Sequence, residues 1–325
     1  MFFLHFLAID FTVCYTYVEP RMAETSDSPQ IIVEDYQPHH SLSTDMSVLK
    51  AMWFANIKGD TLSDELDSFY ESQAHLYDSF RFRMLHGRFP MAQCLAKVLN
   101  EDFGDRNFEE DPLVWVDLGG GTGSNVEFFA RCLGKFRKVI VLDLCHSLVV
   151  EARKRVDAHT PQEAQEAQEA QEEGAVNWQE IVEVVEGDAT RQDTAELQAW
   201  MGRVDIVTFS YALTMIPDWK ASIGLAKSLL RDNGVIGVCD FTVDGSIQSF
   251  QFMKSVWKSI FSIDHVYLNE EHREHLSSEF ESSFHYSNLG DFPYLPGFMV
   301  SCPYYVFVGR KRAEEEGEEN EQKDD

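Results

Sequence analysis

The chain has 325 residues, of which 44% are hydrophobic, and a formal net charge of −28. This length and apolar content are sufficient to bury one sizeable core or two modest ones. The acidic excess argues against a nucleic-acid partner, because binding to phosphate groups requires a basic face.

Residues 1–46 combine an apolar stretch, Phe2 to Val18, with a polar linker. Asp10 interrupts the apolar stretch, which is short for a membrane span, and no Lys or Arg precedes it as in a secretory signal. This pattern leaves a membrane-surface anchor, a targeting segment or a misassigned gene start. The six cysteines are scattered without a CxxC pair, which predicts reduced thiols in a cytoplasmic protein and no metal site.

Residues 47–112 have the periodicity of helices, with apolar and aromatic residues recurring at intervals of three and four. Asp60 and Ser63 are candidate N-terminal caps of one helix, and Gly87 interrupts the pattern ahead of Pro90. We expect these residues to form a helical cover beside the next domain. The residues that carry the pattern are Leu66, Phe69, Tyr70, Leu76, Tyr77 and Phe80.

Residues 113–312 alternate short apolar runs with helical stretches. Strands are predicted at 113–118, 138–144, 181–189, 204–213 and 234–241, with two further strands near Phe284 and at 304–309. Helices are predicted at 125–133, 147–156 and 219–230. Nearly continuous apolar strands alternating with helices indicate an α/β fold, in which helices cover both faces of a mostly parallel seven-stranded sheet. Ligands in such folds bind at the carboxyl ends of the strands.

Two low-complexity segments are expected to carry no functional site. Residues 159–177 include the run QEAQEAQEAQEE, which predicts a helical or disordered surface insertion within the α/β domain. Residues 313–325 are strongly acidic and are expected to form a disordered tail.

The stretch VWVDLGGGTGSN (residues 114–125) joins the first predicted strand to its helix. It fails the dinucleotide pattern G-x-G-x-x-G/A, and it lacks the Gly-Lys-Ser/Thr ending of a phosphate loop. The spacing that fits is Asp-x-Gly-x-Gly-x-Gly, with Gly120 as the variable position. It resembles the first motif of the Rossmann-like, class I S-adenosylmethionine-dependent methyltransferases, which implies S-adenosylmethionine as the cofactor. The matching residues are Asp117, Gly119, Gly121 and Gly123.

Further candidate cofactor residues end the following strands. Asp143, followed by Leu144, ends the second strand, where a carboxylate can accept hydrogen bonds from both ribose hydroxyls. By the resemblance, Asp188 accepts a hydrogen bond from the adenine amine and the Ala189 amide donates to the ring. Ser210 and Tyr211 end the fourth strand beside the transferred methyl group.

Three stretches resemble the methyltransferase part of betaine-lipid synthase: residues 69–88, 143–148 and 263–311. The resemblance covers about residues 49–312. It implies successive N-methylations that convert diacylglyceryl-homoserine to diacylglyceryl-trimethylhomoserine, with Tyr77 and Arg88 lining the cofactor pocket. A separate aminocarboxypropyl-transferase would supply the substrate. The protein would associate peripherally with a membrane such as the endoplasmic reticulum.

An amine must be neutral to attack a methyl group, so a base has to accept its proton. His265 is the first candidate base and Asp78 the second. Aromatic faces hold a quaternary ammonium, and an arginine suits the homoserine carboxylate. The candidates for the head group are Tyr267, Tyr304, Tyr305 and Arg83.

Other interpretations remain open at the level of sequence. A helical face formed by Phe250, Met253, Trp257 and Phe261 suits a membrane interface as well as a core, and the net charge of −28 opposes an anionic membrane. Phosphatidylethanolamine, another lipid or a quinone precursor could be the methyl acceptor. A non-catalytic regulatory subunit is a further alternative, although the intact glycines and acids argue against it.

Overall fold

The computed structural model describes residues 31–36, 38, 48, 59–71, 74, 78, 82–103, 105–159, 176–243, 268–269, 271–291 and 301–312. Three predicted site residues, Tyr77, His265 and Tyr267, lie outside these ranges, as do the predicted interfacial face at 250–261 and the acidic tail. None of the helices that the structure describes has the length and apolar character needed to span a bilayer.

A seven-stranded sheet forms the centre of the molecule, with the strand order β3-β2-β1-β4-β5-β7-β6. The first five strands in sequence pair in parallel, whereas β7 pairs antiparallel with both β5 and β6. The predicted α/β fold with a mostly parallel sheet is therefore confirmed. The strands are β1 (Leu113–Leu118), β2 (Phe136–Asp143), β3 (Val182–Glu186), β4 (Val204–Ser210), β5 (Leu230–Phe241), β6 (Phe280–Asp291) and β7 (Ser301–Lys311).

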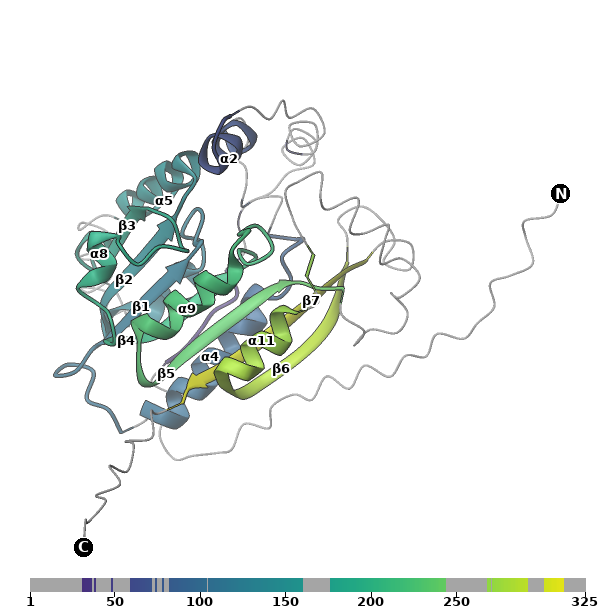
Figure 1. The fold of residues 1–325 in the computed structure, drawn as a ribbon. Helices are drawn as coiled ribbons and strands as arrows, with labels where there is room; N and C mark the ends of the chain where they lie inside the picture. The colour runs from purple at the N-terminus through teal and green to yellow at the C-terminus, as the bar shows by residue number, and fades with distance from the viewer. Residues whose placement is uncertain are drawn as a thin grey trace, which may run out of the picture.

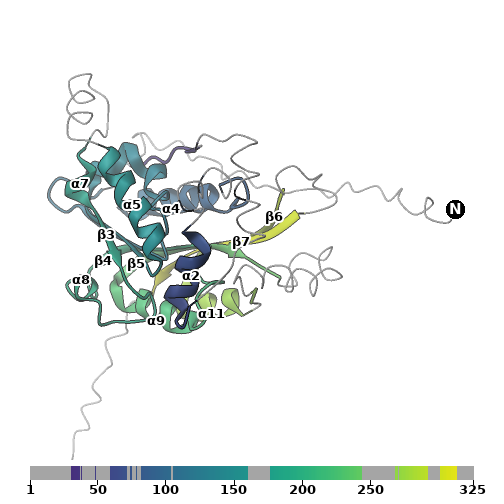
Figure 2. The ribbon, with the colours of Figure 1, turned by 90° about the horizontal axis from the view of Figure 1, so that it is seen from above.

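Helices cover both faces of the sheet, as Figures 1 and 2 show. On one face lie α4 (Arg88–Phe103), the 3-10 helix η2 (Val126–Lys135), α5 (His146–Ala158) and α7 (Trp178–Ile181). On the other face lie α8 (Ala195–Gln198), α9 (Trp219–Leu229) and α11 (His272–Glu279). Each face buries its own apolar cluster, because successive side chains of a strand point to opposite sides of the sheet.

Helix α2 (Leu62–Tyr70) lies near the carboxyl ends of β1 and β2, against the start of α5. Its N-cap is Thr61, whose hydroxyl accepts a hydrogen bond from the Asp64 amide, so neither Asp60 nor Ser63 caps it. The predicted interruption at Gly87 is correct, since α4 begins at the next residue. The cover thus places α2 and the start of α4 beside the same end of the sheet.

Part of the predicted N-terminal linker is docked against the domain. Ile31 is buried and exchanges two hydrogen bonds of 2.8 Å with the side-chain amide of Asn100 on α4. The Glu34 amide donates to the Phe128 carbonyl at 3.0 Å, and Glu34 pairs with Arg131 at 2.9 Å. Residues 31–36, here called the strap, therefore add a short extended segment beside α4 and η2.

His272 on α11 is buried against the edge of the Trp219 ring, and neither of its ring nitrogens has a hydrogen-bond partner among the residues that the structure describes. Burial lowers the pKa of His272 to about 4. In the unfolded chain the imidazole binds a proton below its ordinary pKa of about 6.5. The free energy of unfolding therefore decreases by up to about 3 kcal/mol as the pH falls from about 6.5 towards 4.

We expect His272→Phe to reduce this loss of stability, because phenylalanine keeps the ring and removes the titration. The free energy of unfolding, measured by denaturant titration at pH 7 and pH 4.5, tests the expectation. The exposed His285 of β6 is the control, and His285→Gln should keep the acid sensitivity of the wild type. Equal acid sensitivity in His272→Phe would contradict the assignment.

Candidate functional site

A cavity of about 290 Å³ opens at the carboxyl ends of β1, β2 and β4. It has a floor of strand ends and glycine loop, a wall from α2 and α5, and a second wall from the segment after β4. Nine of the predicted site residues line it together: Arg88, Gly119, Gly121, Asp143, Leu144, Asp188, Ala189, Ser210 and Tyr211.

The glycine loop turns back on itself with Gly119, Gly121 and Gly123 at φ values of 69°, 58° and 71°. Only glycine adopts this left-handed region at little cost, which explains the spacing of two between these positions. At Gly119 space is also limiting, since a Cβ would lie 2.5 Å from the Cβ of Ala212. The loop backbone is thereby held close to the cavity.

Gly120, predicted to be the variable position, is tightly enclosed. A Cβ there would lie 2.7 Å from Val141 Cγ1 and 2.9 Å from Asp117 Oδ2. We expect Gly120→Ala to destabilise the protein by about 1–3 kcal/mol, because neither buried neighbour can move away freely. Thermal and denaturant unfolding measure this loss. Gly224 of α9, whose Cβ would meet nothing within 4 Å, is the control, and Gly224→Ala should not destabilise. A Gly120→Ala variant as stable as the wild type would refute the steric argument.

Asp117 is fully buried beneath the loop and is not among the residues that line the cavity. Its carboxylate accepts hydrogen bonds from Thr208 Oγ1 at 2.6 Å and from Asn125 Nδ2 at 2.9 Å. Burial raises the pKa of Asp117, although these bonds and the nearby Arg88 lower it in part. In the structure Asp117 therefore anchors the glycine loop, whereas we predicted that it contacts the cofactor.

Asp143 and Asp188 present carboxylates to the cavity from the ends of β2 and β3. Asp143 accepts hydrogen bonds from the Gly121 amide at 2.8 Å and the Cys145 amide at 2.9 Å. Burial raises the pKa of Asp143 to about 6. Asp188 accepts from the amide and the hydroxyl of Thr190 at 2.8 and 2.7 Å, so its side chain is fixed by its own turn.

Arg88 is buried at the start of α4, and its guanidinium reaches the end of the glycine loop. Nε and Nη2 donate to Asn125 Oδ1 at 2.9 and 2.8 Å, and Nη2 also donates to Ser124 Oγ at 2.5 Å. The guanidinium lies 5.8 Å from the centre of the Phe82 ring. Nη1 has no hydrogen-bond partner among the described residues, which leaves one donor group of a cavity-lining cation for an anionic ligand.

Tyr211 has a φ of 55°, which is unusual for a residue other than glycine and directs its ring into the cavity wall. Its hydroxyl accepts a hydrogen bond of 3.0 Å from the Gly87 amide, and its ring meets the edge of Phe241 with centroids 4.6 Å apart. Burial raises the pKa of Tyr211 well above its usual value, so the phenol stays protonated at neutral pH.

The two neighbouring tyrosines of β7 lie on opposite faces of the sheet and cannot share one site. Tyr304 is on the face of Tyr211, where a Cβ at Gly87 would lie 3.0 Å from Tyr304 Cδ2. Tyr305 is buried in the cluster beneath α9 and α11. The prediction that both hold one head group is therefore wrong for Tyr305.

Asp78 and Arg83, predicted as base and head-group ligand, are not among the described residues that line the cavity. Both oxygens of Asp78 accept from the Thr122 hydroxyl, and Oδ2 also pairs with Arg155. These contacts occupy the Asp78 carboxylate away from the cavity, so the structure gives Asp78 a positional role. Sequence reasoning overlooked Thr122, Ser124 and Asn125, whose polar side chains directly beside the glycines were the available signal.

The fold and the cavity define a class of protein. The sheet order, the glycine loop after β1 and the acids after β2 and β3 are those of a Rossmann-like methyltransferase. A model of the methyltransferase domain matches residues 86–283, and the chain belongs to this family of class I S-adenosylmethionine-dependent methyltransferases. It is therefore an enzyme that uses S-adenosylmethionine.

Solved structures are similar in fold. A methyltransferase from Anabaena variabilis is 15% identical, with a TM-score of 0.49, covering 78% of this chain and 96% of that one. The 1,6-didemethyltoxoflavin N1-methyltransferase of Burkholderia thailandensis is 18% identical, with a TM-score of 0.40, covering 87% and 95%. At these identities the likeness concerns the fold alone. A search of curated protein sequences returned no match.

The cavity residues suit the cofactor chemically. The carboxylates of Asp143 and Asp188 can accept hydrogen bonds from ribose hydroxyls and from an amine. Nη1 of Arg88 can donate to the carboxylate of the cofactor. The tight glycine loop brings its main-chain atoms close to the cavity between these carboxylates and Arg88. Among the described residues, no group of three or more His, Cys, Asp or Glu side chains is placed to hold a metal ion.

Proposed function

We propose that this methyltransferase acts on the amine of a lipid head group and converts diacylglyceryl-homoserine to diacylglyceryl-trimethylhomoserine. The observation that carries the proposal is the aromatic group beside Ser210, where the Tyr211 ring meets Phe241 and both Tyr211 and Tyr304 border Gly87. Aromatic faces attract the substituted ammonium that accumulates during successive methylations. The resemblance of residues 69–88, 143–148 and 263–311 to betaine-lipid synthase supports the choice of lipid.

S-adenosylmethionine, when bound, supplies a methyl group on a sulfonium, and the amine nitrogen forms the new bond as the carbon–sulfur bond breaks. The protein contributes mainly position and exclusion of water. Arg88, Asp143 and Asp188 hold the cofactor, while Tyr211 borders the acceptor. Because the Tyr211 phenol remains protonated, it acts as a hydrogen-bonding group and not as a base.

Each methylation requires a neutral amine, so the ammonium present before each round must first give a proton to the protein or solvent. With Asp78 engaged by Arg155, His265 is the remaining candidate base of our proposal. The third methylation gives a quaternary ammonium, which has no proton left to release. The aromatic group then attracts the permanent positive charge of the product.

One assay separates this proposal from its alternatives. Purified full-length protein is incubated with labelled S-adenosylmethionine and vesicles containing diacylglyceryl-homoserine, phosphatidylethanolamine or a quinone precursor, and the lipids are resolved. We expect mono-, di- and trimethylated homoserine lipid. Label in phosphatidylethanolamine alone or in the quinone precursor alone would overturn the substrate. Cofactor binding without label in any acceptor would favour a regulatory subunit.

A further inference from the structure

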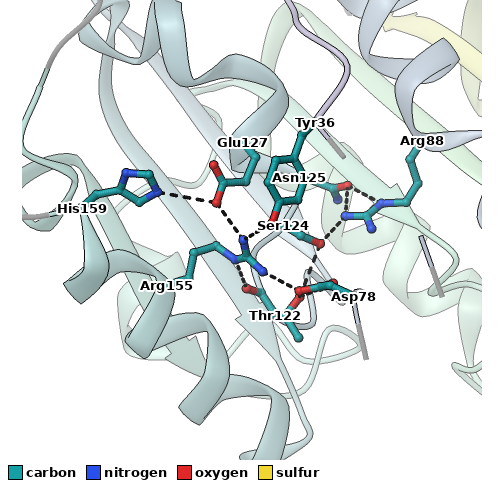
Figure 3. A network of polar contacts seen from close by, with 9 residues as sticks. All are labelled: Tyr36, Asp78, Arg88, Thr122, Ser124, Asn125, Glu127, Arg155 and His159. Atoms are coloured by element: carbon teal, nitrogen blue, oxygen red, sulfur yellow. Dashed lines mark hydrogen bonds and ion pairs between the residues drawn. The ribbon is translucent and has the colours of Figure 1, made fainter. Parts of the chain in front are cut away.

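A polar cluster centred on Arg155 lies behind the glycine loop and joins five parts of the chain (Figure 3). Arg155 belongs to α5, Thr122 to the loop and Glu127 to η2. Asp78 comes from the cover and Tyr36 from the strap. Apart from Thr122, none of these residues is among those that line the cavity.

Arg155 uses each of its three guanidinium nitrogens on a different group. Nε donates to the Thr122 carbonyl at 2.9 Å, Nη1 donates to Glu127 Oε1 at 2.7 Å, and Nη2 pairs with Asp78. The three charged side chains are only 12–16% exposed. One cation thus neutralises two carboxylates that would repel each other without it.

The contacts continue from Asp78 to the cavity. The Thr122 hydroxyl donates to the Asp78 carboxylate at 2.8 and 2.9 Å and lies 3.3 Å from Ser124 Oγ. Ser124 Oγ in turn accepts from Arg88 Nη2. Figure 3 shows this sequence of contacts running from α5 through the loop to Arg88. The cover is therefore attached to the loop at Asp78, ten residues before Arg88, which lines the cavity.

The strap contacts Arg155 directly and Arg88 through Phe82. The Tyr36 ring lies 5.7 Å from the Arg155 guanidinium, and its hydroxyl is 3.4 Å from Nη1. On its other side Tyr36 meets the edge of Phe82 at 5.9 Å, and Phe82 underlies Arg88. The N-terminal segment consequently supports the same arrangement without touching the cavity.

We propose that Arg155 is a positioning residue of the cofactor site, which latches the cover onto the glycine loop through Asp78 and thereby holds Arg88 at the cavity. The inference rests on the assignment of this cavity to S-adenosylmethionine. Without the latch, Asp78 and Glu127 repel, residues 82–88 separate from the loop, and cofactor affinity falls although no residue in contact with the cofactor has changed.

Calorimetric titration of the full-length protein with S-adenosylmethionine and with S-adenosylhomocysteine tests the latch. We expect Arg155→Gln to weaken binding of both by about ten-fold, because two partly buried carboxylates lose the guanidinium that they share. Arg155→Lys keeps the charge, so its loss of cofactor affinity should be smaller. We expect about three-fold, because an ammonium cannot bind the three groups in the same way. Asp78→Asn should reproduce the effect of Arg155→Gln and, in the double variant, add little to it.

Arg310 provides a matched control, because it also grips a carboxylate, that of Asp102, and a serine hydroxyl, but far along the sheet at β7. Arg310→Gln should change cofactor affinity by less than about two-fold. Hydrogen exchange supplies a second measurement, since amides of residues 82–88 should exchange faster in Arg155→Gln and Asp78→Asn and not in Arg310→Gln.

The outcomes separate the two levels of inference. Failure of the wild-type protein to bind either ligand would overturn the cofactor site and the latch with it. Wild-type binding with unchanged affinity and exchange in Arg155→Gln would overturn the latch alone. If Arg155→Gln does not fold, as judged by circular dichroism, Asp78→Asn and Arg155→Lys decide, and wild-type affinity in both would overturn the proposal.

Discussion

Replacing Asp143 with alanine is expected to weaken the binding of S-adenosylmethionine by about a hundred-fold, the equivalent of about 3 kcal/mol. Two ribose hydroxyls lose a charged acceptor, and the Gly121 and Cys145 amides lose the carboxylate that orients them. Calorimetric titration at pH 7.5 measures the change. Asp193→Ala is the control, because Asp193 pairs with Arg191 at the surface.

The same carboxylate predicts how affinity depends on pH. The free protein has a pKa of about 6 at Asp143, above the ordinary value, because burial disfavours the charged form. Ribose hydroxyls favour the carboxylate, so binding lowers this pKa and releases a proton when the free protein holds one. Affinity should therefore be constant above about pH 7 and fall as the pH decreases through 6.

Asp143→Asn removes the titration while keeping the shape of the side chain. Its affinity for S-adenosylmethionine should be low at every pH and nearly constant between pH 5 and pH 8. If Asp143→Asn shows the same fall below pH 6 as the wild type, another group is responsible. A wild-type affinity that rises on acidification would contradict the ribose assignment itself.

The strands and the cofactor loop could be predicted because their determinants are local. The nearly continuous apolar run at residues 113–118 is buried on both faces, and the glycines that follow it mark its end. The left-handed φ values of Gly119, Gly121 and Gly123 follow from a spacing that is visible in the sequence. Residues at the ends of successive parallel strands then meet at one edge.

What could not be predicted depends on partners far away in the chain. Asp78 was a reasonable base until the fold placed Arg155, seventy-seven residues later, against it. Tyr304 and Tyr305 are neighbours in one strand and must point to opposite faces, but which of them lies on the side of Tyr211 depends on the register of β7. The strap looked like linker, because its few apolar residues gain stability only from α4 and η2, which follow much later.

Arg88 gives the prediction that most directly tests how the cofactor is oriented. Arg88→Met is expected to weaken the binding of S-adenosylmethionine by about a hundred-fold or more. The substitution removes a buried cation that binds Ser124 and Asn125 and whose Nη1 is available to the ligand. Arg88→Lys should recover little, since an ammonium cannot form the same fork. The loss should be measured by titration of the full-length protein.

A second ligand distinguishes the contact from a general collapse of the site. Methylthioadenosine keeps the ribose and adenine but lacks the amino-acid carboxylate. If Arg88 pairs with that carboxylate, Arg88→Met should bind methylthioadenosine nearly as well as the wild type does, whereas Asp143→Ala should lose affinity for both ligands. Equal losses for both ligands in Arg88→Met would instead assign Arg88 to holding the loop. Because Ser124 and Asn125 also hydrogen-bond to Arg88, the hydrogen exchange of residues 119–125 should be measured in the same variant. If these amides stay protected while only the binding of S-adenosylmethionine is lost, Arg88 contacts the ligand directly.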